Sequence, residues 1–255
     1  MRIRLSTPSI GTLCLFLCVS IAEGQTPTPT AQASLAAQVV DPTSPLKSLL
    51  LQNKYSPSVW GVDDNWNQVD IQIAFPHEAL DMSHILRITV PYVTSQPSGE
   101  RGLSDVVIFD VVLYPRKWGM LAVGGVGSLG TYKGPGIDTL ALGPAVGAIL
   151  KKNKWTYGAF NQNFLSFGDI ARTQIQPVLA YTYSDKVSFA IGDAQWTIDW
   201  NKGRFVDIPI SGQVNYIAQI QQQPIRLFLN LQYNAVNEPI TRKWSITTGL
   251  AFLVK

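Results

Sequence analysis

The sequence predicts an all-β fold, an antiparallel up-and-down transmembrane β-barrel of about 12 strands. Three observations support this fold class. Apolar and polar residues alternate with a period of two through most of the chain after residue 46, connections between these segments are alternately long and tight, and aromatic residues concentrate near segment ends. Charged residues make up only 15% of the 255 residues, whereas an ordinary soluble domain has roughly 25%.

Residues 1–24 have the features of a secretory signal peptide. Arg2 and Arg4 supply a positive start, residues 10–21 are apolar, and small residues before position 25 suit cleavage. A membrane anchor is the weaker interpretation, because the apolar stretch is shorter than the ~20 residues of a spanning helix. Both cysteines, Cys14 and Cys18, lie in this segment. We therefore expect no disulfide and no thiolate metal site in the mature chain.

Residues 25–45 are rich in Thr, Pro, Ala and Gln and are expected to be a flexible leader. The barrel is expected over residues 46–255. Within it, Leu227, Leu229 and Leu231 share one face of a segment while Phe228 and Asn230 share the other. The predicted strands are 47–56, 67–75, 83–92, 103–114, 118–129, 139–150, 155–164, 173–183, 187–199, 204–217, 224–234 and 242–254.

The connections between these segments predict the orientation of the barrel. Long connections at 57–66, 93–102, 130–138, 165–172 and 235–241 are expected on the cell surface, and tight ones at 115–117, 151–154 and 184–186 in the periplasm. The short connection at 200–203 departs from this pattern. Pro144, Pro177 and Pro209 fall inside predicted strands, and we expect a row of β-bulges to accommodate them.

The apolar face of each strand is expected to contact lipid. Aromatic residues near the strand ends are typical of the girdles at membrane interfaces. A soluble β-sandwich with a buried apolar face shows the same alternation, so a secreted soluble β protein remains a third alternative. The girdle candidates are Tyr55, Trp118, Trp155, Tyr183, Trp200, Tyr233 and Trp244.

A series of short motifs runs through residues 46–255. They are Ser56-Pro57-Ser58-Val59-Trp60-Gly61, Gly102-Leu103-Ser104-Asp105, Phe109-Asp110, Gly143-Pro144, Asn161-Gln162-Asn163, Ser166-Phe167, Gln176-Pro177 and Gln195-Trp196-Thr197-Ile198-Asp199-Trp200. With these motifs the chain resembles a transporter-like family of bacterial outer-membrane β-barrels, akin to proteins of the phenol-degradation meta pathway and often labelled neuromedin U. The resemblance implies uptake of small, often aromatic, molecules. The C-terminus departs from the usual barrel ending on an aromatic residue, because it reads Phe252-Leu253-Val254-Lys255.

No catalytic or cofactor-binding pattern stands out, and we expect the protein not to be an enzyme. The only two histidines, His77 and His84, lie seven residues apart in a predicted turn, whereas a zinc-binding helix places two histidines four apart. We therefore expect no metal site. The glycines at 124–127 are not followed by the Lys-Ser/Thr of a phosphate loop. The net charge of +3 gives no concentrated positive field, which argues against nucleic acid as a partner.

Inward-facing polar residues are the candidate functional residues. Arg87 and Arg226 are expected to be the main cationic contacts for an acidic or aromatic solute. If nothing permeates, we expect these arginines to pair with Asp70 and Asp207 and to leave no continuous opening. The predicted solute path is lined by Asp70, Gln72, Arg87, Asp207, Arg226, Asn230, Gln232 and Lys243.

The function favoured by the sequence is a passive channel or uptake barrel in the cell outer membrane of a Gram-negative bacterium. A non-conducting structural or adhesive outer-membrane barrel is the alternative. The expected partners are outer-membrane lipid and lipopolysaccharide, the barrel-assembly machinery and a small-molecule solute. No cofactor is expected.

Overall fold

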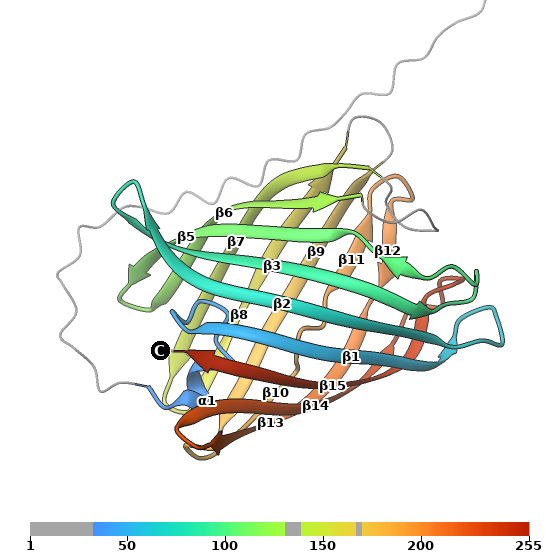
Figure 1. Ribbon diagram of the computed structural model, residues 1–255. Helices are drawn as coiled ribbons and strands as arrows, with labels where there is room; N and C mark the ends of the chain where they lie inside the picture. Colours follow the sequence, from blue (N-terminus) through green and yellow to red (C-terminus); the bar gives the residue numbers. More distant parts are fainter. Residues whose placement is uncertain (1–32, 131–138, 167–169, 255) are drawn as a thin grey trace, which may run out of the picture.

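The computed structural model describes residues 33–130, 139–166 and 170–254, which form a closed antiparallel barrel (Figure 1). The predicted fold class is confirmed, because the 15 strand segments of these residues combine into 12 barrel strands. β10 and β11 together form one barrel strand, β12 and β13 form another, and β4 pairs only with β3. The predicted signal peptide lies outside the described residues.

The elements follow one another around the barrel. A short helix, α1 (Leu35–Gln38), precedes the strands. Among the described residues, no helix is long and apolar enough to cross a membrane. The strands are β1 (Lys47–Val59), β2 (Trp66–Ala79), β3 (Met82–Ser95), β4 (Gly102–Leu103), β5 (Val106–Arg116), β6 (Gly119–Leu129), β7 (Ala141–Lys152), β8 (Trp155–Leu165), β9 (Ala171–Thr182), β10 (Val187–Ala190), β11 (Trp196–Asp199), β12 (Arg204–Asp207), β13 (Pro209–Ile220), β14 (Gln223–Asn234) and β15 (Arg242–Val254).

The barrel has a turn end and a loop end. Tight connections at 80–81, 117–118, 153–154, 183–186 and 221–222 lie at the turn end, at the left of Figure 1, with the start of β1 and the end of β15. The connections at 60–65, 96–101, 200–203 and 235–241 lie at the loop end. Pairing of β1 with β15, from Lys47 opposite Val254 onward, closes the cylinder. The alternation of long and tight connections is therefore present as predicted, apart from the short connection 200–203.

The wall is interrupted at residues 191–195, inside what the sequence predicts as one strand over 187–199. β9 pairs with β10 through residues 180–182 and with β11 through residues 172–175. Pro177 lies in the stretch of β9 between these two pairings, and Pro209 begins β13 across the same gap. Proline has no backbone N–H to donate, so the ladder cannot be completed at either position.

The predicted row of β-bulges at the prolines is wrong. Pro177 keeps its register with β8, and Pro144 keeps its register with β6. On the β8 side of Pro144 the pairing lapses for two residues without a shift, and the Asn163 side-chain amide donates to the Pro144 carbonyl at 3.1 Å. The register shifts in the barrel lie instead in β1, in β2 and at Thr197–Ile198.

The outer wall is apolar and carries two aromatic bands. Its mid-strand positions expose leucine, isoleucine and valine side chains, such as Leu229, Ile73 and Val146. Trp118, Trp155 and Tyr183 lie near the turn end and are exposed; Tyr55, Trp200 and Trp244 are exposed near the loop end. The rings of Tyr233 and Trp244 are in contact in a tilted arrangement, with ring centres 4.6 Å apart. Apolar side chains therefore face outward along the strands, as the sequence predicts.

The inward faces are not uniformly polar. On β3 and β5–β9, buried apolar side chains fill part of the interior, where the ring centres of Phe109 and Phe160 lie 5.8 Å apart. Polar inward residues dominate β1, β2, β13, β14 and β15 instead. The buried apolar cluster on β3 and β5–β9 comprises Ile85, Phe109, Val111, Ala122, Val126, Ala141, Ala145, Ile149, Phe160, Phe164 and Val178.

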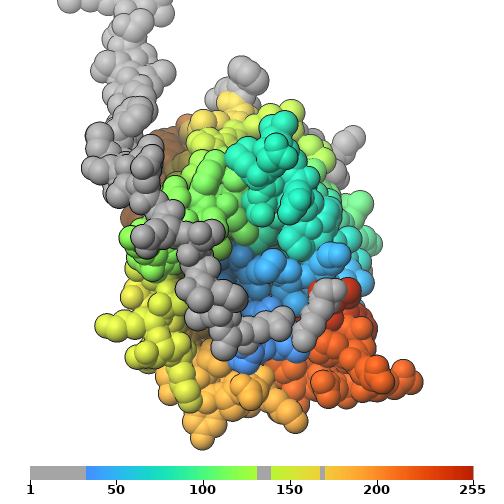
Figure 2. All heavy atoms as spheres, turned by 90° about the vertical axis from the view of Figure 1, so that its left-hand side faces the viewer, coloured from blue at the N-terminus to red at the C-terminus, as the bar shows by residue number. Residues whose placement is uncertain are grey.

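Residues 33–46 pack into the turn end of the barrel, although composition predicts a flexible leader over 25–45. Ala36 and Leu46 are buried against inward side chains of β13, β14 and β15, including Phe228. The Lys151 ammonium forms an ion pair with the Asp41 carboxylate. Figure 2 looks onto this end, where the blue start of the described chain lies between green, yellow and orange strands.

Candidate functional site

The interior contains two cavities that share part of their lining. The larger, about 620 Å³, lies toward the loop end, and the smaller, about 110 Å³, lies between it and residues 38–46. Four residues line both cavities: Gln72, Arg87, Gln176 and Asp193. We call these four residues the constriction, because they lie where the two cavities adjoin.

Asp193 reaches the constriction because the wall is interrupted around it. Residues 191–195 do not pair as a strand, and the Asp193 side chain is exposed in the interior, where it accepts a hydrogen bond from the Gln176 amide at 3.1 Å. Its carboxylate interacts electrostatically with both Arg87 and Arg226. Neither arginine forms an ion pair within 4.0 Å among the described residues. The positive charge of Arg87 at the constriction and that of Arg226 in the smaller cavity beside it therefore remain available.

Each arginine is held in place by an aromatic ring. The Arg226 guanidinium lies 4.6 Å from the centre of the Phe228 ring, and its Nε donates to Asn215 Oδ1 at 2.9 Å. The Arg87 guanidinium lies 5.5 Å from the centre of the Phe109 ring, and its Nε has no hydrogen-bond partner. A guanidinium over an aromatic ring gains cation–π attraction while its N–H groups can still bind an anion.

Asp70 belongs to a separate polar cluster on β1 and β2. Its carboxylate accepts hydrogen bonds from the amides of Gln52 at 2.8 Å and Gln68 at 2.5 Å, and the Lys54 ammonium lies 2.8 Å away. The Arg242 guanidinium donates to the Gln68 side-chain oxygen at 2.6 Å. Asp70 is fully buried and lines neither cavity. The Asp70 carboxylate is consequently neutralised by Lys54 and does not face the cavities.

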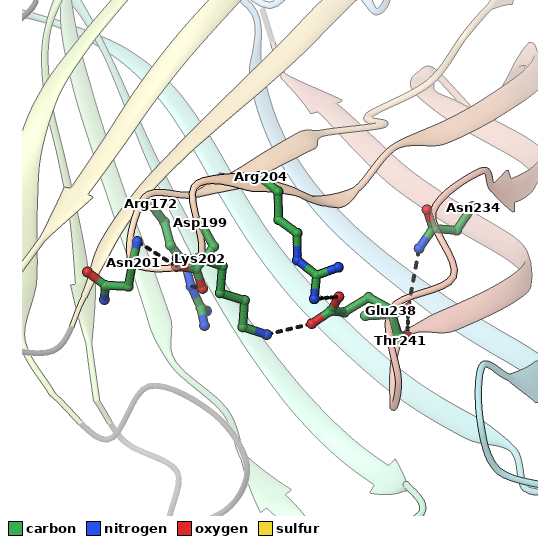
Figure 3. Close-up of polar contacts among 8 residues, drawn as sticks. All are labelled: Arg172, Asp199, Asn201, Lys202, Arg204, Asn234, Glu238 and Thr241. Carbon is green, nitrogen blue, oxygen red and sulfur yellow. Dashed lines mark hydrogen bonds and ion pairs between the residues drawn. The ribbon is translucent and has the colours of Figure 1, made fainter.

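Ion pairs join two connections at the loop end (Figure 3). Lys202 Nζ and Arg204 approach the Glu238 carboxylate at 2.5 Å and 2.7 Å, and Arg172 lies 3.4 Å from Asp199. The hydrogen bond donated by Lys202 is the largest cause that holds the pKa of Glu238 below its ordinary value. Residues 238–241 line the larger cavity, so this linkage fixes a connection beside the mouth.

The predicted path residues separate into three groups. Gln72 and Arg87 lie at the constriction, while Arg226 lines the smaller cavity and Asp207 the larger one. Asp70 and Asn230 are buried in side-chain hydrogen bonds, and Gln232 lines neither cavity. Lys243 lies with its ammonium 4.5 Å from the centre of the Trp60 ring and also lines neither cavity.

The predicted pairing of Arg87 and Arg226 with Asp70 and Asp207 is not found. Lys54 is the ion-pair partner of Asp70, and Arg242 is the cation that acts on Asp207. Sequence reasoning missed Asp193, the carboxylate that faces both arginines. A Gly-Asp pair at 192–193, in the middle of a supposed strand, was the available signal, because these residues favour turns over strands.

No family model and no curated protein matches this sequence. Among solved structures, the chain is similar to the COG4313 outer membrane channel from Pseudomonas putida F1, with 11% identity and a TM-score of 0.57 over 82% of this chain and 94% of that one. It is also similar to the KdgM porin, with 8% identity and a TM-score of 0.53 over 82% of this chain and 99% of that one. A second KdgM structure, in complex with disordered oligogalacturonate, gives 10% identity and a TM-score of 0.53 over the same shares. The fold is therefore that of outer-membrane β-barrels.

Proposed function

We propose that this protein is a passive outer-membrane channel for small solutes and that its constriction favours anions. The observation that carries the proposal is the meeting of two interior cavities at Arg87 and Asp193, with Arg226 beside them. Two guanidinium groups face one carboxylate there, so the local charge is positive. An acidic or aromatic solute would gain both charge attraction and stacking.

Several other charges of the barrel have an ion-pair partner. Lys54 is paired with Asp70 and Arg172 with Asp199, and Glu238 takes both Lys202 and Arg204. Paired charges contribute little net field, whereas Arg87 at the constriction and Arg226 beside it share the single carboxylate of Asp193. Arg87 and Arg226 should therefore dominate the choice between anions and cations.

The apolar outer wall and its aromatic bands support insertion in a membrane. Exposed apolar side chains continue around the barrel, whereas soluble monomers rarely expose apolar patches larger than a few hundred Å². Outer-membrane lipid and lipopolysaccharide are accordingly the proposed surroundings, and the barrel-assembly machinery the proposed route of insertion. A secreted soluble β protein would instead appear in the soluble fraction and show no heat-modifiable gel mobility.

Channel activity is tested by single-channel recording of the purified barrel in planar bilayers. We expect conductance with an anion preference, and we expect the Arg87→Ala, Arg226→Ala double variant to shift the reversal potential in a salt gradient toward cations. Lys243→Ala removes one positive charge away from both cavities and is the control for each single arginine variant. No conductance in any variant, or equal shifts in the double variant and the control, would exclude the proposal.

The packing of residues 33–46 specifically favours the alternative, a non-conducting structural or adhesive barrel. These residues occupy the turn end and are held by apolar contacts and by the Asp41–Lys151 ion pair. Deletion of residues 33–44 distinguishes the two functions. A channel whose turn end is obstructed should gain conductance on deletion, whereas a barrel with no continuous interior should remain silent.

We further propose that the protein is not an enzyme and needs no cofactor for transport. Two of the solved structures to which it is similar are described as an outer membrane channel and a porin. The constriction offers arginine, glutamine and aspartate side chains and no nucleophile paired with a base. Solute binding at Arg87 and Arg226 requires only charge and hydrogen bonding.

A further inference from the structure

The β2–β3 hairpin brings the two histidines of the sequence together. The turn at 80–81 makes His77 and His84 direct cross-strand partners, with ring centres 4.9 Å apart. Their separation of seven residues argued against a metal site only because a helix was the assumed scaffold. On a hairpin, residues equally distant from the turn lie opposite each other. β2 extends to Ala79, so these positions are strand rather than turn.

A carboxylate from the next strand completes the cluster. Asp110 on β5 lies with its oxygens 3.8 Å from His77 Nε2 and 3.4 Å from His84 Nδ1. One nitrogen or oxygen from each of the three side chains lies within 4.8 Å of the others. Charged hydrogen bonds close to roughly 2.7–2.9 Å, so these distances are too long for a tight His–Asp ion pair.

The cluster lies on the outer wall rather than in the interior. His77 shares a face with the exposed Ile71 and Ile73, and Asp110 shares a face with the exposed Ile108. The neighbouring outward positions are apolar, with the Phe75 ring centre 5.9 Å from that of His77. Polar and charged groups on a lipid-facing surface are destabilising unless they are compensated.

Several polar atoms of the cluster have no hydrogen-bond partner. They are buried in spite of their outward position, and the 3.4 Å approach of His84 to Asp110 is not directed as a hydrogen bond. Such atoms carry a desolvation cost that a bound cation would remove. The unpartnered atoms are His77 Nδ1, His84 Nδ1, His84 Nε2 and Asp110 Oδ1.

We propose that His77, His84 and Asp110 form a binding site for a divalent transition-metal ion of the zinc class on the outer wall. Two imidazoles and one carboxylate are a ligand set that Zn²⁺ accepts, with a solvent molecule in the fourth position. Tetrahedral zinc places its ligand atoms roughly 3.3 Å apart, so small side-chain rotations close the observed gaps.

Two local features suit an ion there. Gly125 is the partner of Asp110 on β6, and a side chain at that position would meet only a carbonyl oxygen at 3.7 Å, so the space beside the carboxylate is open. β3 and β5 pair through only six residues of each strand, and His84 is the paired residue of β3 nearest the turn end. A metal bridging His84 and Asp110 would therefore clamp the β2–β3 hairpin to β5 where their pairing ends.

The test is a Zn²⁺ titration of the barrel extracted in detergent, purified through a histidine-free tag, with cysteines alkylated and metal removed. We expect saturable binding of one ion per chain and a loss of affinity of about tenfold or more in His84→Ala and in Asp110→Asn. Glu78→Gln, which removes a nearby exposed carboxylate, is the matched control and should bind as the unmodified chain does. Heat-modifiable gel mobility reports folding of each variant.

A second measurement needs no variant. Zn²⁺ should protect both histidines of the unmodified barrel from diethyl pyrocarbonate, and it should raise the temperature at which the barrel loses its compact gel mobility. Absence of saturable binding, unchanged affinity in His84→Ala, one ion per two chains, or full modification of both histidines in the presence of Zn²⁺ would each overturn the proposed site.

Discussion

Leu229 and Gln232 lie three positions apart on β14 and on opposite faces of the wall. Leu229 is 46% exposed on the outer face, whereas Gln232 follows the inward row of Phe228 and Asn230. We expect Leu229→Arg to reduce the folding free energy in lipid vesicles by about 2–4 kcal/mol, because a charge near the bilayer midplane is costly. Gln232→Arg, with the same new charge facing inward, should be tolerated. Equal losses in a denaturant titration would contradict the assignment of faces.

Gly192 is a single residue on which the interrupted wall depends. Its φ of +67° is in the left-handed region, and a side chain there would collide with the Asn230 amide and approach Gln213. We expect Gly192→Ala to lower stability by roughly 1–2 kcal/mol from the backbone alone and to displace Asn230. Thermal unfolding followed by gel mobility measures the loss. Gly212→Ala, at a site with nothing within 4 Å, is the control and should have little effect.

At the scale of elements, the segment 33–46 is tied to the barrel by one ion pair as well as by apolar packing. Asp41 is buried and Lys151 is half-exposed at the end of β7. We expect Asp41→Lys to release the segment and raise conductance, because it leaves two ammonium groups facing each other. Adding Lys151→Asp should restore the original conductance. In a double-variant cycle of unfolding free energies, the two substitutions should show a coupling energy of about 0.5–3 kcal/mol. Absence of coupling would show that the ion pair does not hold the segment.

The connections 200–203 and 235–241 form a second coupled element, and their coupling depends on pH. The pKa of Glu238 is lowered below its ordinary value of 4.5 by the hydrogen bond from Lys202. The ion pairs therefore stabilise the connections above that ordinary value, and this contribution is lost as the pH falls through the lowered pKa of the folded state. Limited proteolysis at decreasing pH should show the loss. The Glu238→Gln variant should be cleaved at the same rate at every pH. If its cleavage depended on pH as that of the unmodified chain does, a group other than Glu238 would cause the loss.

For the whole molecule, the arrangement of the two ends predicts its orientation in the membrane. Gly99 lies in a connection of the loop end, and Asn153 lies in a tight turn at the opposite end. We expect a peptide tag at Gly99 to be labelled on intact cells and a tag at Asn153 to be labelled only after permeabilisation. Gly134, the other position where a tag is expected on the cell surface, lies outside the described residues. Labelling of a tag at Asn153 on intact cells would show that the barrel has the opposite orientation.

The sequence by itself determined the class of fold and most strand positions. Side chains on a strand alternate faces, so Leu227, Leu229 and Leu231 were readable as an outward row from local order alone. The same rule placed Arg87 and Arg226 inside the barrel. Both belong to regular strands, in which facing depends only on odd or even position.

The tertiary structure alone decided how these residues combine. Asp193 faces the two arginines because Pro177 and Pro209, from different strands, interrupt pairing on both sides of residues 191–195. Lys54 rather than Arg226 neutralises Asp70 because β1 is the neighbour of β2. His77, His84 and Asp110 meet only through the registers of β2, β3 and β5. Alternation fixes the face of each residue, but its neighbours across the sheet depend on strand order and register, which no single segment encodes.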